Sequence, residues 1–422
     1  MSLRRLLGLS AAVSDNLRRS LSTAASTHPP WAIIDSTSLV DRSSSAPGAC
    51  FRPVEPPGVS SISAPAHLLS PRECPAPDSK VVQVLGGDVR AASGDGLLLL
   101  NYCDLRAEAP CNSWDLSKDV EIGRFVCNPL SGQMLRLPDI GGSKTTLLFH
   151  HMGLLTQADG GARGQGPPPD RFAVADLVHN GAALERFLSD EGEWRTVMMS
   201  RPCRSRLLRP MAVNQETVAF GGRLWWVDST LGAMSVDPFD ERPDICCIEL
   251  PRGSVLPARA PSESGDFRKA EENVKFMQEV AKYRRVGVSE GRLRYAELTP
   301  GGPFLLSSFA LDDEGSGWTL ENQLELKEVL ANGGYPLQRN AAAPQIAVLD
   351  PLDASAVHLK VGDHVVVVDM HNGKVIKASQ LQDKYLSLIP CVLPPWLLGA
   401  SRIPTAGKKD DMEATDDQVI CL

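Results

Sequence analysis

The sequence predicts an all-β protein with a β-propeller-like fold of about five to six four-stranded blades and one short amphipathic helix inserted among the strands. Two observations lead to this prediction. From Trp31 onward, short apolar runs with β-branched and aromatic residues are separated every eight to twelve residues by Gly, Pro, Asp or Asn, which indicates an all-β meander. In addition, a unit of four strands in about 35 residues recurs along the chain, and this is the size of one propeller blade.

The unit is clearest at 221–238, which reads GGRLWWVDSTLGAMSVDP. A short strand at 217–220 precedes the glycine pair, which suits a two-residue hairpin turn, and the next strand covers 223–228. The chain then reverses and runs back over 233–237, and ICCIEL at 245–250 makes a fourth strand.

Two features of this unit recur. An Asp or Asn before Pro can accept a hydrogen bond from the backbone N–H two residues on, while Pro presets φ and ends the strand ladder. Such turns therefore indicate structure before they indicate function. Asx-Pro turns of this kind occur at 127–132, 236–241 and 349–354, and strands that open after glycine occur at 95–102, 221–228, 290–297 and 362–369.

The blades follow from these repeats. The runs LLLL at 97–100 and VVVV at 365–368 are typical of strands that are covered on both faces, as they are between packed blades. Strands from 31–54 are expected to complete a sixth blade by pairing with the C-terminal part. The five other blades are placed at 81–138, 147–200, 213–251, 284–330 and 344–382.

Several segments interrupt the strand pattern. A surface loop is expected at 160–171 and a basic connector at 201–210. From residue 262, apolar residues alternate at spacings of three and four, and Glu271 stands four before Lys275, so one amphipathic helix docked on a propeller face is predicted there. Its apolar positions are Phe267, Ala270, Val274, Met277 and Ala281.

The two ends of the chain differ from its body. Residues 1–27 are rich in Ser, Ala and Leu, carry four arginines and have Asp15 as their only acid, which is the composition of an organelle transit peptide. We expect a mitochondrial location; a basic arm without import function would leave the protein in the cytoplasm or nucleus, and a chloroplast is less favoured. Residues 28–400 are assigned to the propeller-like domain, and 401–422 to an acidic disordered tail.

Composition narrows the classes of partner. A formal net charge of −8 disfavours an electrostatic grip on nucleic acid, which needs clustered Lys and Arg. No apolar run approaches the roughly 18 residues of a membrane-spanning helix, so no membrane insertion is expected. The ten cysteines form no C-x-x-C pair and are interpreted as scattered small hydrophobes in a reducing compartment.

Some segments resemble functional motifs without satisfying them. GGSKTT at 141–146 fails the phosphate-loop template because Ser143 and Pro138 stand where that template needs glycine. GGDVRAASGDG at 86–96 lacks the dinucleotide-binding spacing and is interpreted as strand-flanking turns. His150 and His151 are adjacent and would face opposite sides of a strand, so a structural role is favoured over a shared metal.

The remaining candidates lie in or near the repeated unit. His358, His364 and His371 share one predicted blade but fall on different strands and turns. Asp228 and Asp237 could be paired carboxylates, although strand-end turn residues are the favoured interpretation. Trp225 and Trp226 point to opposite faces of their strand and are expected to pack between blades. No catalytic, cofactor-binding or metal-binding residue is therefore predicted, and no cofactor.

The chain resembles a plant family, expanded in grasses, that is defined by the domain of unknown function 1618. Its core is expected at about 213–382, and the family implies no catalytic residues. CNPLSGQMLRLP at 127–138 also resembles the strand and turn of F-box-associated and kelch-like repeats, although nothing resembling an F-box precedes it. The matching segments are PPWAII at 29–34, GRLWWVD at 222–228 with DPF at 237–239, RRVGVSEGRLRY at 284–295, WTLE at 318–321 and PCVLPPWL at 390–397.

Two functions remain open at this point. The first is a non-enzymatic interaction or scaffold module, expected to be a monomer, whose loops bind a protein partner of unknown identity. The alternative is an enzyme or small-molecule binder with a site at the central channel. Three or more ionisable side chains that converge on one apolar-walled pocket would favour the alternative.

Overall fold

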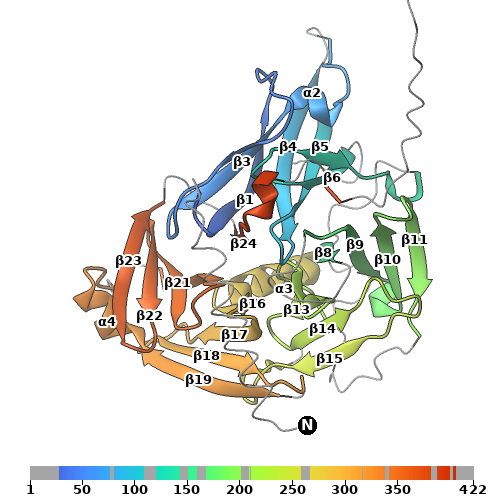
Figure 1. The fold of residues 1–422 in the computed structure, drawn as a ribbon. Helices are drawn as coiled ribbons and strands as arrows, with labels where there is room; N and C mark the ends of the chain where they lie inside the picture. The colour runs from blue at the N-terminus through green and yellow to red at the C-terminus, as the bar shows by residue number, and fades with distance from the viewer. Residues whose placement is uncertain are drawn as a thin grey trace, which may run out of the picture.

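The chain forms a ring of four-stranded antiparallel blades, a β-propeller, with one helix over its middle (Figure 1). The all-β prediction is confirmed. The computed structural model describes residues 28–76, 80–108, 120–142, 151–158, 168–200, 209, 211–257, 267–315, 317–337, 342–381, 387–399 and 403–404. The proposed leader at 1–27, the acidic tail from 408, and most of the loop at 160–171 and of the connector at 201–210 lie outside these residues.

Five blades follow one another along the chain, each with its strands in sequence order. Their bounds agree with the predicted ones to within a few residues at the strand ends. Blade 1 comprises β4 (Val81–Ala92), β5 (Leu98–Glu108), β6 (Val120–Cys127) and β7 (Met134–Arg136). Blade 2 comprises β8 (Gly153–Gln157), β9 (Arg171–Val178), β10 (Ala183–Leu188) and β11 (Trp194–Met198).

The next three blades have the same order from the centre of the ring outward. Blade 3 comprises β12 (Val218–Phe220), β13 (Arg223–Asp228), β14 (Gly232–Val236) and β15 (Cys246–Glu249). Blade 4 comprises β16 (Arg284–Ser289), β17 (Arg292–Leu298), β18 (Leu305–Leu311) and β19 (Trp318–Glu325). Blade 5 comprises β20 (Gln345–Leu349), β21 (Ala356–Val361), β22 (His364–Asp369) and β23 (Lys374–Gln380).

Blade 6 joins the two ends of the described chain. Strand β24 (Leu388–Val392) pairs antiparallel with β1 (Trp31–Asp41), and Trp31 lies opposite Val392. Strand β1 pairs in parallel with β3 (Val59–Pro65), which pairs with β2 (Cys50–Arg52). The predicted pairing of 31–54 with the C-terminal part is confirmed, but the sequence analysis missed β3.

The ring is closed on itself. The innermost strands β4, β8, β12, β16, β20 and β24 contact their neighbours in this order, and β24 contacts β4 again. Blades 6 and 1 are also joined into one sheet, because Thr37 and Ser38 of β1 pair with Asp88 and Gly87 of β4. No open sheet edge therefore separates the first blade from the last at the centre of the ring.

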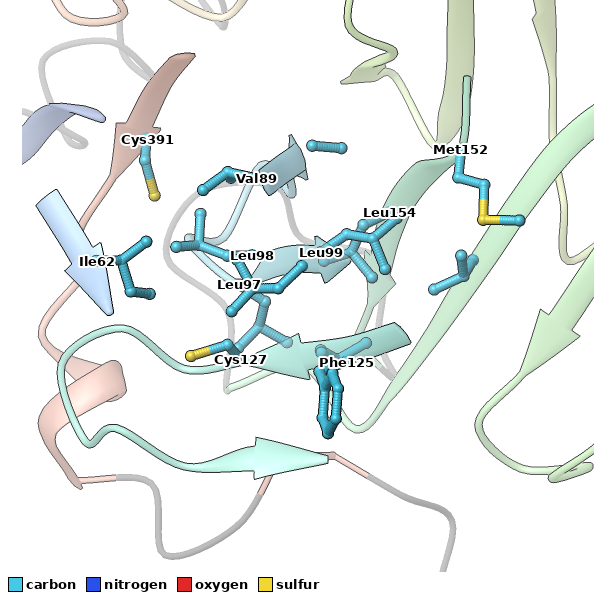
Figure 2. Packing of buried hydrophobic residues seen from close by; sticks show 14 of the residues in the cluster. Ile62, Val89, Leu97, Leu98, Leu99, Phe125, Cys127, Met152, Leu154 and Cys391 are labelled. Carbon is cyan, nitrogen blue, oxygen red and sulfur yellow. The ribbon is translucent and has the colours of Figure 1, made fainter. Parts of the chain in front are cut away.

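Apolar side chains fill the spaces between blades, as both-face burial of the strands requires. The largest cluster gathers around Leu97, Leu98 and Leu99 of blade 1 (Figure 2). Ile62 and Cys391 reach it from blade 6, whereas Met152 and Leu154 reach it from the beginning of blade 2. The run LLLL thus has the burial that its sequence predicts. Its four leucines are 0% exposed.

The predicted turns are present. Gly221 and Gly222 have φ of +69° and +74° and join β12 to β13 with Phe220 opposite Arg223. In each Asx-Pro turn the side-chain oxygen accepts a hydrogen bond from the backbone N–H two residues on. The pairs are Asn128 with Leu130 at 3.1 Å, Asp237 with Phe239 at 2.8 Å and Asp350 with Leu352 at 2.8 Å.

Helix α3 (Phe267–Ala281) is the predicted amphipathic helix, and it contacts β16 at the middle of the ring (Figure 1). The carbonyl oxygen of Met277 accepts a hydrogen bond from Asn214 Nδ2 at 3.0 Å. Its docked face differs from the predicted one, because Val274 is 56% exposed whereas Phe276 is half-buried. The short helices are α2 (Ala66–Leu69), α4 (Leu326–Asn332), α5 (Trp396–Gly399), η1 (Ile140–Gly142) and η2 (His179–Gly181).

One expectation about cysteine is wrong. Cys247 on β15 is disulfide-bonded, whereas all ten cysteines were expected to be unpaired small hydrophobes. The spacing of cysteines along the chain carries no information on which of them approach each other in the fold. Cys127 and Cys391 do match the expectation, since both are free and buried. The helices in the described part of the chain include none that is long and apolar enough to cross a membrane.

Candidate functional site

The two adjacent tryptophans lie in the core, as predicted. Trp226 is 0% exposed and packs against blade 2, and its indole N–H donates to the carbonyl oxygen of His151 at 2.7 Å. Trp225 is 8% exposed and packs against blade 4, and its indole N–H donates to the carbonyl oxygen of Phe220 at 3.0 Å. Neither ring is available to a ligand.

The two aspartates of the same unit do not form a carboxylate pair. Asp228 is 0% exposed and accepts hydrogen bonds from the backbone N–H of Thr230 and of Ala212, both at 2.9 Å. Arg209 neutralises it at 3.3 Å. Asp237 holds its own Asx-Pro turn. Carboxylate oxygens of both residues accept hydrogen bonds from nearby backbone N–H groups, so the interpretation as turn residues is supported.

The histidines are dispersed. His358 is 2% exposed, lies 3.3 Å from Asp350 Oδ2 and meets the ring of Trp31 edge-on at 5.2 Å between centroids. His364 pairs with Asp363 at the surface. Of the adjacent pair, His150 lies outside the described residues, as do residues 143–146 of GGSKTT. No group of three His, Cys, Asp or Glu residues in the described part of the chain could hold a metal ion.

Hydrogen bonds cross the centre of the ring where its inner strands begin. Thr217 Oγ1 donates to the carbonyl oxygen of His151 at 2.7 Å. The side-chain oxygen of Gln215 accepts a hydrogen bond from the backbone N–H of Val286 at 2.9 Å. Arg285 on β16 is 8% exposed. Its guanidinium pairs with Glu216 and donates to the carbonyl oxygen of Leu388 on β24 at 2.7 Å. These groups link the strands to one another, and this arrangement does not favour a substrate site there.

Hollows lie instead where β1 separates from β4 beyond their short pairing. The smaller one, about 30 Å³, has room for on the order of one or two water molecules. Tyr102 lines it, the hydroxyl of this residue lies 2.5 Å from that of Ser38, and burial raises the pKa of Tyr102. Burial also acts to raise the pKa of Asp104, but hydrogen bonds from Gln83 and Arg72 outweigh it and hold that pKa below its usual value. This hollow is a structural polar pocket.

The larger hollow, which we name the β1–β4 groove, is an open cavity of 570 Å³. This volume lies within the range of about 300–1,000 Å³ that is common for ligand sites. Strands β2 and β3 of blade 6 form its floor. In their register Cys50 of β2 lies opposite Ser63 of β3, and Arg52 lies opposite Ser61. The groove is lined by Leu39, Val40, Asp41, Arg42, Ser43, Cys50, Arg52, Ser61, Ile62, Ser63 and Leu85.

This groove is not predicted by the sequence. Its residues come from four strands and one loop, and two of its walls depend on β3, which was not predicted. The segment DRSSS at 41–45 matches no motif, so its only signal is a cation among hydroxyls at the end of a strand. Pairing in register, rather than spacing in the sequence, brings Arg42, Arg52 and the serines together.

Comparisons with known proteins give distant similarities to solved structures. No protein-family model matches the chain, and no curated protein shows significant similarity to it. A chain in the crystal structure of the mitotic checkpoint complex is 10% identical, with 75% of this chain and 74% of that chain covered and a TM-score of 0.33. The β-propeller domain of Cps50 (Swd1) from Myceliophteria thermophila is 10% identical, with 70% and 86% covered and a TM-score of 0.31.

A third similar structure is the WD40 domain of SCAP from fission yeast. It is 11% identical, with 82% of this chain and 78% of that chain covered and a TM-score of 0.27. At these identities and TM-scores the likeness carries no statement about the function of this chain. The chain is a β-propeller by its own topology, in which four-stranded blades follow one another and close into a ring.

Proposed function

We propose that this protein is a non-enzymatic propeller scaffold that binds a partner protein, with the β1–β4 groove as part of its binding surface. One observation carries the proposal: the groove is an open hollow of 570 Å³ on blade 6, whereas at the start of the channel Arg285 of β16 binds Glu216 before blade 3 and the backbone carbonyl of Leu388 on β24. A rigid ring that presents a recessed, mixed polar and apolar surface suits recognition of another chain.

The wider expectations are part of the same proposal. We infer that the protein belongs to the plant family defined by the domain of unknown function 1618 and that residues 1–27 direct it to mitochondria. The GRLWWVD segment at 222–228 and the DPF segment at 237–239 support the first inference, and the four arginines of the leader support the second.

Site-specific crosslinking in living cells tests the scaffold proposal. A photo-crosslinking amino acid replaces Ser61, which is half-buried in the floor of the groove, in the tagged full chain. The matched control places it at Leu320, which is 49% exposed on the outer strand of blade 4. We expect a reproducible protein adduct at position 61 and none at position 320. Absence of any protein adduct at position 61 would contradict the proposal.

A further inference from the structure

Two arginines line the β1–β4 groove. Arg42 and Arg52 are both exposed, and neither guanidinium forms a hydrogen bond or an ion pair with the described residues. Most other arginines on the blades are engaged; Arg223, for example, binds Asp244 and the carbonyl oxygen of Ser235. A guanidinium without a protein partner keeps its planar set of donors for a carboxylate from outside.

The one acid of the groove, Asp41, forms hydrogen bonds within its own loop. Asp41 Oδ1 accepts hydrogen bonds from the backbone N–H and the hydroxyl of Ser43, at 2.8 and 2.7 Å, and from the N–H of Ser44 at 3.1 Å. These bonds, with a smaller effect of the charge on Arg52, lower the pKa of Asp41. The lining has a formal charge of 2 − 1 = +1, whereas the whole chain carries −8. The groove is thus a local positive site on an anionic protein.

Hydroxyl and apolar groups complete the surface. The hydroxyls of Ser61 and Ser63 face the groove, and neither bonds any described residue. Leu39 is 60% exposed beside them, although the preceding residue Ser38 is buried. A ligand that fits must therefore present carboxylates to the arginines and at least one apolar side chain to Leu39.

We propose that the β1–β4 groove binds an acidic, extended peptide segment of the partner protein. The inference rests on the proposed scaffold function and names the chemistry of the partner. The volume of 570 Å³ exceeds what a single inorganic anion would fill, and its apolar wall favours a peptide over a polyanion such as nucleic acid. Because the rest of the chain is anionic, an acidic segment is attracted here and repelled elsewhere, which fixes where it docks.

The test measures binding of two synthetic peptides to the full chain by fluorescence anisotropy. The probe is a labelled octapeptide of alternating aspartate and leucine, and the reference carries asparagine in place of aspartate. We expect tighter binding of the aspartate probe, and an affinity that falls with added salt. R42Q/R52Q should weaken binding of that probe by about threefold to thirtyfold, the combined effect of two exposed charge pairs.

The matched control is R242Q/R252Q. It removes two exposed arginines from loops of blade 3, so the net charge changes equally while the groove stays intact. We expect this variant to bind the aspartate probe like the natural chain, and both variants to keep its melting temperature. Equal affinity for the aspartate and asparagine peptides would overturn the inference, as would equal losses in the two variants.

Two further outcomes separate this inference from the scaffold proposal. Binding of a single-stranded oligonucleotide that is lost in R42Q/R52Q would overturn the peptide assignment. A protein adduct at position 61 that persists in R42Q/R52Q would support the scaffold function and contradict the inference that the partner segment is acidic. Loss of that adduct in R42Q/R52Q, but not in R242Q/R252Q, would support both the scaffold function and the acidic partner segment.

Discussion

Trp225 and Trp226 join three blades through one strand. Because neighbouring side chains on β13 point to opposite faces, one ring enters the space toward blade 4 and the other enters the space toward blade 2. Each ring also places its N–H on a backbone carbonyl, which satisfies the only polar atom that burial would otherwise leave unpaired.

Truncation of the more buried ring should destabilise the whole ring of blades. Trp226→Ala removes a side chain that is 0% exposed, and we expect it to lower the free energy of unfolding by about 3–5 kcal/mol. Chemical denaturation measures the change. Leu320→Ala, at a residue that is 49% exposed, is the control and should cost less than about 0.5 kcal/mol. A loss at Trp226 no greater than in this control would contradict the packing role.

For single residues, the sequence predicted the structural role of a side chain but not the residues that it contacts. Alternation along a strand is a local property, so the opposite directions of the two tryptophans and the turn roles of Asp228 and Asp237 could be inferred. Arg285 could not be identified, because its partners Glu216 and Leu388 lie 69 and 103 residues away along the chain. The free arginines of the groove were hidden for the same reason.

Among the elements, the Asx-Pro turns are the most regular feature. Asn128, Asp237 and Asp350 each bond the N–H two residues on and so redirect the chain as it leaves a strand. Asn128 has one additional function. Its Nδ2 donates at 2.9 Å to the carbonyl oxygen of Leu397 in α5, so this turn also holds the C-terminal helix against blade 1.

Two alanine substitutions separate these functions. Asp237→Ala removes a turn bond alone and should cost about 1 kcal/mol of unfolding free energy. Asn128→Ala removes the turn bonds and leaves a buried carbonyl without its donor, so we expect a loss of about 2–3 kcal/mol. Thermal unfolding at one pH gives both values. Equal losses would show that the bond to Leu397 contributes nothing.

Elements with a dense apolar run or a long helical period were predictable, and elements without such a pattern were not. Strand β3, VSSISAP, carries three serines and ends at a proline, so it lacks the dense apolar run that marked the other strands. Helix α4 has only seven residues, too few for a helical period to stand out, yet Leu326, Val329 and Leu330 are buried. The prediction of the docked face of α3 was wrong because contacts with the ring, rather than the apolar pattern of the helix, determine which side is covered.

At the scale of the whole molecule, Arg285 is a buried cation that links separate blades near the centre of the ring. Arg285 connects the start of blade 4 with Glu216 before blade 3 and with the closing strand of blade 6. A buried charge of this kind matters most when its partner is removed, because the remaining charge is left in a poorly hydrated site.

A double-mutant cycle tests this link. Arg285→Met should cost about 3 kcal/mol of unfolding free energy, since Glu216 then lacks its cation. Arg285→Met combined with Glu216→Met should recover part of that loss. Lys377→Met removes a cation from a pair whose side chains are 57% and 75% exposed, so it serves as the control and should cost less than about 1 kcal/mol. A double variant no more stable than Arg285→Met would argue against coupling across the channel.

Blade 6 also constrains when the protein can fold. Its innermost strand, β24, is made from residues 388–392, and its other strands come from the first 65 residues. During synthesis, which adds about 5–20 residues per second, blades 1 to 5 can therefore form in order before β1 gains β24, its partner on the inner side. A nonsense codon between residues 381 and 387 would leave blades 1 to 5 complete but remove β24, so β1 would lose its antiparallel partner on that side. Such a product exposes strand edges that favour aggregation, so quality control should remove it rather than leave a shortened but working ring.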